Sequence, residues 1–215
     1  MTRTDWSGWA LGAATLAVYA FIMAPIVSIV VFSFNADRFP SLPWGGFSLD
    51  WYAAILADDT VRAGLWRSLT VAGVVSAAAT TIGFATAYLD YRFRFTGKLP
   101  FLVLATLPPT VPVLILGLAM LSFFSLVDLM GRIEGVMVGH IVLCSPFAMA
   151  LIRMRLAELD PDAEPAAWNL GATRLATIRE VVIPHCAPSI FAALAITAAV
   201  SFDEFMIAWF VSGLE

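Results

Sequence analysis

Long apolar stretches separated by short polar segments dominate the pattern of this chain. Five stretches carry no charged residue; they contain 31, 22, 29, 18 and 22 residues and cover positions 6–36, 68–89, 99–127, 135–152 and 181–202. A helix needs about 20 apolar residues to cross a bilayer, so each stretch is long enough or nearly so. The pattern predicts an all-α, polytopic membrane protein with five transmembrane helices, folded as a single domain over residues 1–215.

Two of the predicted spans have a distinct internal pattern. The third contains Pro108, Pro109 and Pro112, each of which removes a helix hydrogen bond, so we expect this helix to be bent or interrupted. The second carries small residues at helical spacing, a pattern that lets membrane helices approach closely. These residues are Ala72, Ser76, Thr80, Gly83 and Ala87.

The segment 35–67 between the first two spans predicts an ordered loop. Residues 39–46 combine proline, glycine and aromatic side chains, a composition typical of turns. Trp51, Tyr52, Ile55 and Leu56 then follow at helical spacing. Tryptophan and tyrosine are enriched where a membrane meets water, which favours a short interfacial helix; a surface that docks a partner is the alternative.

Composition narrows the class of protein. Hydrophobic residues make up 60% of the chain and charged residues 13%, against roughly 25% charged in a typical soluble domain. This excludes a soluble enzyme and makes the lipid bilayer the first partner. The basic residues form no dense block, so we expect no nucleic-acid binding. Cys144 and Cys186 lie in apolar stretches and predict no metal site.

The charges of the short loops predict the orientation. With the N-terminus inside, the inner loops 1–6, 90–98 and 153–180 carry eight Lys or Arg residues, whereas the outer loops carry four. Cytoplasmic loops are enriched in Lys and Arg, so we expect a multi-pass protein with a cytoplasmic N-terminus.

The long polar segment that begins at residue 153 predicts structure of its own. Asp160-Pro161 is a helix-start signal, Gly171 is a helix-stop signal, and Thr173 suits the cap of a second helix. We therefore expect a short helix that lies across the cytoplasmic face, with Ala166, Ala167 and Trp168 exposed to a partner.

These residues resemble the EAA loop of the permease subunits of ABC importers. That pattern reads E-A-A, three residues, G, nine residues and I-x-L-P; here Ala166-Ala167, Gly171 and Val181-Val182-Ile183-Pro184 match in register. The whole sequence is similar to spermidine/putrescine-type permeases in bacterial inner membranes. The stretches that carry this similarity are 32–35, 46–52, 107–109, 159–161 and 201–205.

The resemblance implies partners and a coupling site. Such a permease pairs with a second permease and two ATPase subunits, and an external solute-binding protein delivers the substrate. The chain lacks a phosphate-binding loop of the form G-x-x-x-x-G-K-[ST], so ATP and Mg²⁺ are expected in the partner ATPase and no catalytic residue or cofactor is expected here. The coupling loop spans 153–185. Its implied ATPase-coupling residues are Glu164, Ala166, Ala167, Trp168, Gly171 and Pro184.

The chain departs from the EAA pattern at one position. Pro165 stands where the pattern has Glu, and the Glu is one residue earlier, at Glu164. Because proline fits best in the first turn of a helix, we expect the docking helix to begin near residues 164–165 or to bend there. The sequence alone does not show whether Glu164 makes the salt link that the Glu of the pattern makes.

Two acids near the end of the fifth stretch are candidates for the substrate pathway. Asp203 continues a face of small residues, which predicts that it points into the helix bundle, while Glu204 lies on a neighbouring stripe. Acids at membrane depth usually face a cavity or a partner, and the alternative is a pair solvated at the outer interface. For His140 and His185 we expect structural hydrogen bonds.

The predicted function is therefore one half of the translocation pathway of an ABC importer, with a polyamine as the leading substrate. Alternatives are a permease for another small solute (an amino acid, a sugar derivative or a metal chelate) or a stand-alone secondary transporter that uses Asp203 and Glu204 for coupling. An intramembrane enzyme lacks a paired nucleophile and base.

The end of the chain gives a last expectation. Five spans from a cytoplasmic N-terminus leave residue 215 outside, whereas the resembled family has a sixth span that returns to the cytoplasm. The sequence ends at Val211-Ser212-Gly213-Leu214-Glu215, so we expect a shortened form in which some packing surface of the bundle is uncovered.

Overall fold

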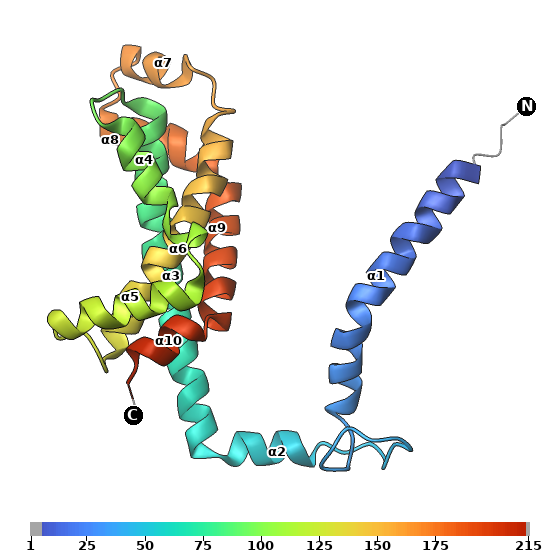
Figure 1. Ribbon diagram of the computed structural model, residues 1–215. Coiled ribbons are helices and arrows are strands. Elements are labelled where there is room, and N and C mark those ends of the chain that lie inside the picture. Colours follow the sequence, from blue (N-terminus) through green and yellow to red (C-terminus); the bar gives the residue numbers. More distant parts are fainter. Residues whose placement is uncertain (1–5, 214–215) are drawn as a thin grey trace, which may run out of the picture. The chain divides into compact units, whose positions relative to one another are not determined.

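A computed structural model describes residues 6–213 of the protein. Arg3 and the last two residues, on which two of the predictions above depend in part, lie outside this range. The described chain is helical and falls into two compact units, residues 1–65 and 66–215. Figure 1 shows the elements of each unit.

The first unit contains a single long apolar helix and an ordered loop. Helix α1 (Trp6–Phe32) exposes its side chains from residue 8 through residue 31, as a helix surrounded by lipid would. In the loop, the buried Asn35 side chain accepts backbone N–H groups from Asp37 and Gly45, at 3.4 and 3.2 Å. Helix α2 (Asp50–Ala57) follows and contains the predicted interfacial aromatics. The expectation of an ordered loop with a short helix is confirmed.

The second unit is built on three long helices. They are α3 (Asp59–Arg92), which enters the unit at residue 66, α6 (Ile133–Leu156) and α9 (Ile183–Asp203). Across the described chain, four helical segments are long and apolar enough to cross a membrane: Gly8–Phe32, Asp59–Arg92, Ile133–Leu156 and Arg174–Asp203.

The third predicted span is not one continuous helix. It is divided into α4 (Lys98–Thr106), a 3₁₀ turn η1 (Pro108–Thr110) and α5 (Val113–Leu126). The break falls at the three prolines, as expected. Helix α5 has 14 residues, or about 21 Å at 1.5 Å per residue, which is shorter than the roughly 30 Å of a bilayer core.

Small residues on α3 let it approach its neighbours. The predicted stripe is buried along its whole length. A Cβ atom on Gly83 would lie 2.7 Å from the Cβ of Ala148 and 2.7 Å from the backbone N of Met149 on α6, so only glycine fits there without a shift. Ser76 donates a 2.7 Å hydrogen bond to the carbonyl of Leu194 on α9.

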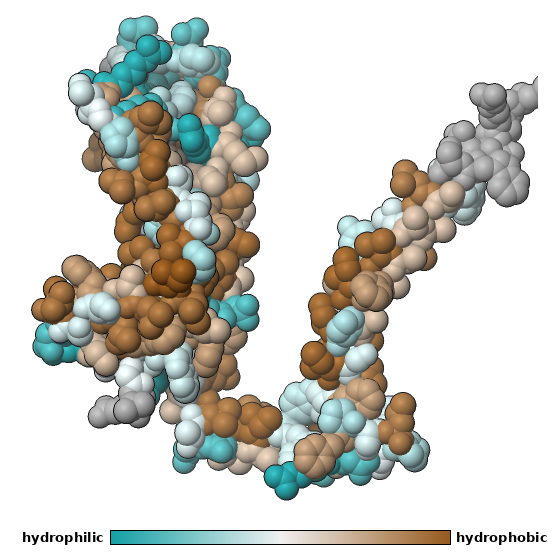
Figure 2. Space-filling model, in the orientation of Figure 1, coloured by the Kyte–Doolittle hydropathy of each residue, from teal (hydrophilic) through white to brown (hydrophobic). Residues whose placement is uncertain are grey.

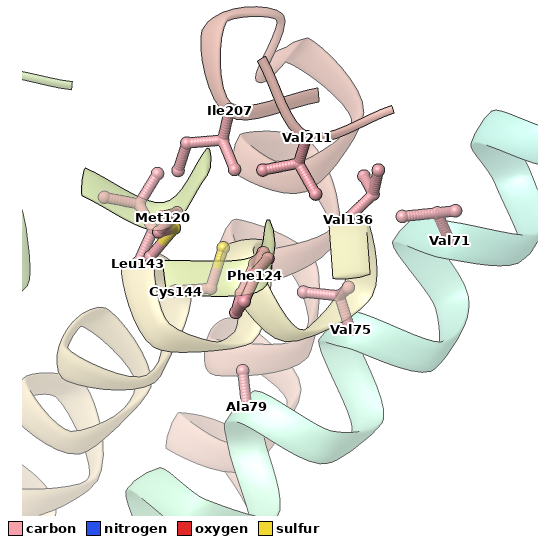
Figure 3. Packing of buried hydrophobic residues seen from close by; sticks show 10 residues of the cluster. All are labelled: Val71, Val75, Ala79, Met120, Phe124, Val136, Leu143, Cys144, Ile207 and Val211. Atoms are coloured by element: carbon pink, nitrogen blue, oxygen red, sulfur yellow. The ribbon is translucent and has the colours of Figure 1, made fainter. Parts of the chain in front are cut away.

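Two apolar clusters form the core of this unit. The first joins α3, α5, α6 and the short helix α10 (Met206–Val211), and Figure 3 shows its side chains converging from these helices. The second joins α3, α6 and α9 nearer the loop that follows α6 and includes Ala148, Ile152, Val182 and Cys186.

The loop after α6 supplies three short elements. Helix α7 (Ala163–Asn169) is followed by α8 (Arg174–Thr177) and a π-helical turn η2 (Ile178–Val182), which leads directly into α9. Polar residues gather around α7 and α8, whereas apolar residues dominate the helices below them (Figure 2). Pro184 is the second residue of α9, two residues after the end of the π turn.

Candidate functional site

The short helix predicted in the loop 153–185 is confirmed as α7. Gly171 has φ +89°, the left-handed conformation that ends helices. Its N–H donates to the carbonyl of Trp168 at 2.9 Å, and the next N–H donates to Ala167 at 3.0 Å. This is a Schellman ending, which satisfies carbonyls that would otherwise lack partners. Thr173 then caps α8 by accepting the N–H of Ala176 at 3.2 Å.

Helix α7 begins at Ala163, one residue before the predicted start at 164–165. Pro165 is therefore the third helical residue, in the first turn, where a helix leaves N–H groups without intrahelical partners. The proline is exposed. Its lack of an N–H thus costs the helix no hydrogen bond, which is why the chain accommodates it here.

Glu164 lies inside the protein and not on the outer face of α7. Its side chain is only 3% exposed, and its Oε2 lies 2.9 Å from Nε of Arg92 at the end of α3. The hydroxyl of Tyr88 donates to its Oε1 at 3.1 Å. The salt link that the sequence left open is therefore made within the chain.

The outer face of α7 is smaller than predicted. Ala166 is exposed, as expected, and Leu170 is 90% exposed at the end of the helix. Ala167 and Trp168 are half-buried, so the expectation that both are exposed was wrong in part. The Trp168 ring turns inward because the guanidinium of Arg92 lies over it, 4.7 Å from the ring centroid, a cation–π geometry.

A reciprocal pair of hydrogen bonds ties the end of α6 to the start of α9. Nε of Arg155 donates to the carbonyl of His185 at 3.0 Å, and Nε2 of His185 lies 3.0 Å from the carbonyl of Arg155. Both ends of the loop are thus fixed next to each other. The structural role expected for His185 is confirmed.

The two candidate pathway acids differ from the prediction. Asp203 is exposed, together with the Ala192, Ala195 and Ala199 face, so the expectation that it points into the bundle of this chain was wrong. The neighbouring stripe of Ala193 and Thr197 is the buried one. Small residues alone do not tell which of two adjacent small faces is covered, and here both faces contain them.

Glu204 is the buried acid of the pair. Its side chain is 7% exposed. It accepts backbone N–H groups from Met206, Ile207 and Ala208 at 3.0, 2.8 and 3.4 Å. The carboxylate therefore caps α10, where negative charge is stabilised by the helix dipole. The break between α9 and α10 at residues 204–205 places it there.

His140 on α6 lies beside this carboxylate. Its Nε2 is 3.4 Å from Oε2 of Glu204 without a hydrogen bond, while its Nδ1 shares a 3.0 Å hydrogen bond with Ser201. The hydrogen bond expected for His140 is confirmed. These groups line a cavity of about 720 Å³ whose wall also includes Arg67 and Arg132.

Sequence reasoning missed a third buried acid. Asp90 on α3 pairs with Lys98 at 2.9 Å and with Arg153 of α6 at 2.6 Å. Sequence reasoning also missed Tyr88 and Arg92. They lie four residues apart on α3 and contact Glu164. One feature of the sequence could have indicated Asp90. It lies directly after the apolar stretch 68–89, and an acid in such a position usually faces a partner.

Comparison with known proteins identifies the class. The sequence pattern described as "binding-protein-dependent transport system inner membrane component" matches residues 79–214. The chain belongs to this family. It is a multi-pass membrane protein, and the matched region contains α6, the loop 153–185, α9 and α10.

Individual relatives are similar over most of the chain. The spermidine/putrescine transport system permease protein PotC of Escherichia coli K12 is 31% identical over 206 residues, covering 94% of this chain and 76% of PotC. PotC of Haemophilus influenzae is 30% identical over 92% of this chain and 77% of the relative. The putrescine transport system permease protein PotI of E. coli K12 is 33% identical over 91% and 72%.

Proposed function

We propose that this protein is the permease subunit of an ABC importer that carries polyamines across the bacterial inner membrane, with its N-terminus in the cytoplasm. The observation that carries the proposal is the similarity to three polyamine permeases over more than nine-tenths of the chain. Spermidine and putrescine are polycations, so an acid in the pathway suits the cargo.

The proposed partners follow from the family. A second permease completes the pathway, two ATPase subunits bind ATP and Mg²⁺ in the cytoplasm, and an external solute-binding protein delivers the polyamine. No cofactor is assigned to this chain. The lipid bilayer surrounds the spans, and nucleic acid has no role.

The coupling role is assigned to the loop 153–185. Ala166 and Leu170 on the exposed side of α7 are the contact surface offered to the ATPase. Gly171 and Pro184 shape the turn behind α7 and the entry into α9. Glu164, Trp168 and the half-buried Ala167 act from the inner side of α7.

Asp203 is the acid that we assign to the cargo. It is exposed at the end of α9, and no ion pair occupies it within the described range 6–213. Glu204 supports this end of the pathway by holding α10 in place. A carboxylate with free lone pairs binds an ammonium group without first breaking internal hydrogen bonds.

One observation favours the alternative of a secondary transporter. A buried Glu204 close to His140 at membrane depth is the arrangement used by proton relays. The two functions differ in their energy source, since the importer requires ATP and the secondary transporter requires an ion gradient.

Uptake of radiolabelled spermidine tests the substrate class. The protein and its partners are expressed in cells that lack other polyamine uptake, and unlabelled competitors are added. We expect competition by spermidine or putrescine and none by a neutral amino acid or a sugar. Competition by the amino acid or the sugar instead, with no labelled polyamine taken up, would contradict the assignment.

A further inference from the structure

Two pairs of side chains interlock between α3 and α7. Tyr88 and Arg92 are four residues apart on α3, and Glu164 and Trp168 are four residues apart on α7, so each pair shares one helix face. Arg92 contacts both members of the opposite pair: its Nε lies 2.9 Å from Glu164 and its guanidinium lies 4.7 Å from the Trp168 ring centroid. We call these four residues the latch.

The latch is anchored by a buried acid, whereas the Arg92 side chain is 39% exposed. The Glu164 side chain is 3% exposed, and both of its oxygens have partners, one from Tyr88 and one from Arg92. Removing one partner from a buried ion pair leaves an uncompensated charge, which is costly. Sliding α7 along α3 would incur the same cost.

The chain already joins α7 to two other long helices. Residues 157–162 connect it to the end of α6, and residues 170–182 connect it through α8 and η2 to α9. No short segment of the chain joins α7 to α3, because α3 ends at Arg92 and α7 begins only at Ala163. The latch is therefore the direct link from α7 to the third long helix of the unit.

We propose that Arg92 and Glu164 are positioning residues that make α3 move together with α7. This inference rests on the proposed function, because it assumes that an ATPase displaces α7. With the latch closed, a displacement of α7 is passed to α3, α6 and α9 at once. With the latch open, α7 loses its direct link to α3, which then follows only through its packing on α6 and its hydrogen bond to α9.

The same end of α3 offers a matched control. Asp90 is also buried and ion-paired, with Lys98 and Arg153, but none of these partners lies on α7. A change at Asp90 therefore perturbs the stability of this region without opening the latch. A change at Glu164 opens the latch.

The test compares Glu164→Gln, Tyr88→Phe and Asp90→Asn in the assembled transporter. For each, we measure co-purification of the ATPase, the rate of ATP hydrolysis and the uptake of spermidine in the presence of the solute-binding protein. The decisive quantity is uptake per ATP hydrolysed. A loss of folded complex does not change this ratio, because uptake and hydrolysis then fall together.

We expect Glu164→Gln to retain the ATPase and to lower uptake per ATP by about fivefold or more, the range of a typical coupling energy. Tyr88→Phe lowers it less, and Asp90→Asn lowers the yield of complex but not the ratio. If Glu164→Gln takes up as much spermidine per ATP as the wild type, the proposed role of the latch is wrong. If Glu164→Gln does not assemble, the same result in Tyr88→Phe shows that the role is wrong. Failure of the wild-type complex to couple ATP to uptake would instead overturn the proposed function.

Discussion

Arg92 and Glu164 are 72 positions apart in the sequence, yet Nε of the first lies 2.9 Å from Oε2 of the second. This contact explains the departure from the EAA pattern. One residue along an α-helix turns a side chain by about 100°, so a Glu at position 164 faces α3 while position 165 faces outward. The exposed Pro165 and the buried Glu164 are two results of one shift in register.

The buried pair predicts an asymmetry between its two members. Arg92→Ala leaves the largely buried Glu164 carboxylate with Tyr88 as its remaining polar partner, and an uncompensated charge in such a position destabilises the fold. Because the Arg92 side chain is 39% exposed, the loss is smaller than for a pair buried on both sides. Glu164→Gln removes the buried charge itself and is milder. Thermal unfolding of the detergent-solubilised protein should rank Arg92→Ala below Glu164→Gln. Arg179→Ala, a change at an exposed arginine of η2, is the control and should match the wild type; equal loss in all three would contradict the prediction.

Close packing of α3 against α6 gives a second prediction. Gly83→Ala places a methyl group 2.7 Å from Ala148 and from the Met149 backbone, and overpacking of this kind costs about 1–3 kcal/mol. Gly73→Ala, in the same helix with nothing within 4 Å, is the matched control. We expect a lower unfolding temperature for Gly83→Ala only. The same unfolding temperature in both variants would show that the helices are not packed as described.

The turn behind α7 gives a third prediction. Gly171 has φ +89°, and a Cβ atom added to it would have no neighbour within 4 Å, so a substitution costs backbone strain and not a clash. That strain is roughly 1–2 kcal/mol for an ordinary residue. Gly171→Val should reduce uptake or release the ATPase while membrane insertion is retained. Gly171→Asn should be tolerated, since asparagine visits this conformation; full transport by the Val variant would contradict the role of the turn.

Much of this architecture follows from the sequence by simple physical rules. Apolar length predicts α1, α3, α6 and α9, prolines predict the break between α4 and α5, and Gly171 with Thr173 predicts the ends of α7 and α8. Each of these depends on neighbours in the chain. Burial of the small stripe on α3 also follows, because one helix face carried all of its members.

The site was harder to predict because it depends on contacts between distant residues. The sequence indicated Asp203 and Glu204 as candidates for the substrate pathway. It did not indicate that Glu204 caps α10, because that role requires the helix to break at residues 204–205. It indicated Glu164 but not its partners, because Tyr88 and Arg92 come from another helix. Which of two small faces of α9 is buried likewise depends on where α3 and α6 lie.

The separate environments of Asp203 and Glu204 give a fourth prediction. Asp203→Asn removes an exposed charge and should leave the unfolding temperature unchanged while it slows spermidine uptake; capture by the solute-binding protein should not change. Glu204 accepts three backbone N–H groups at the start of α10 through both of its carboxylate oxygens. Glu204→Gln leaves one acceptor oxygen, so the unfolding temperature should fall, by at most the change that corresponds to a lost cap, about 1 kcal/mol in the free energy of unfolding. Unchanged uptake in both variants would assign the pair a purely structural role.

The most direct test of the central claim is the energy source of transport. The assembled complex is reconstituted into proteoliposomes with the solute-binding protein outside, and accumulation of radiolabelled spermidine is measured with ATP and Mg²⁺ inside, with a non-hydrolysable analogue inside, or with a proton gradient alone. We predict accumulation with ATP and none with the analogue or the gradient. Accumulation driven by the proton gradient in the absence of ATP would contradict the assignment of this protein as an ABC-importer permease.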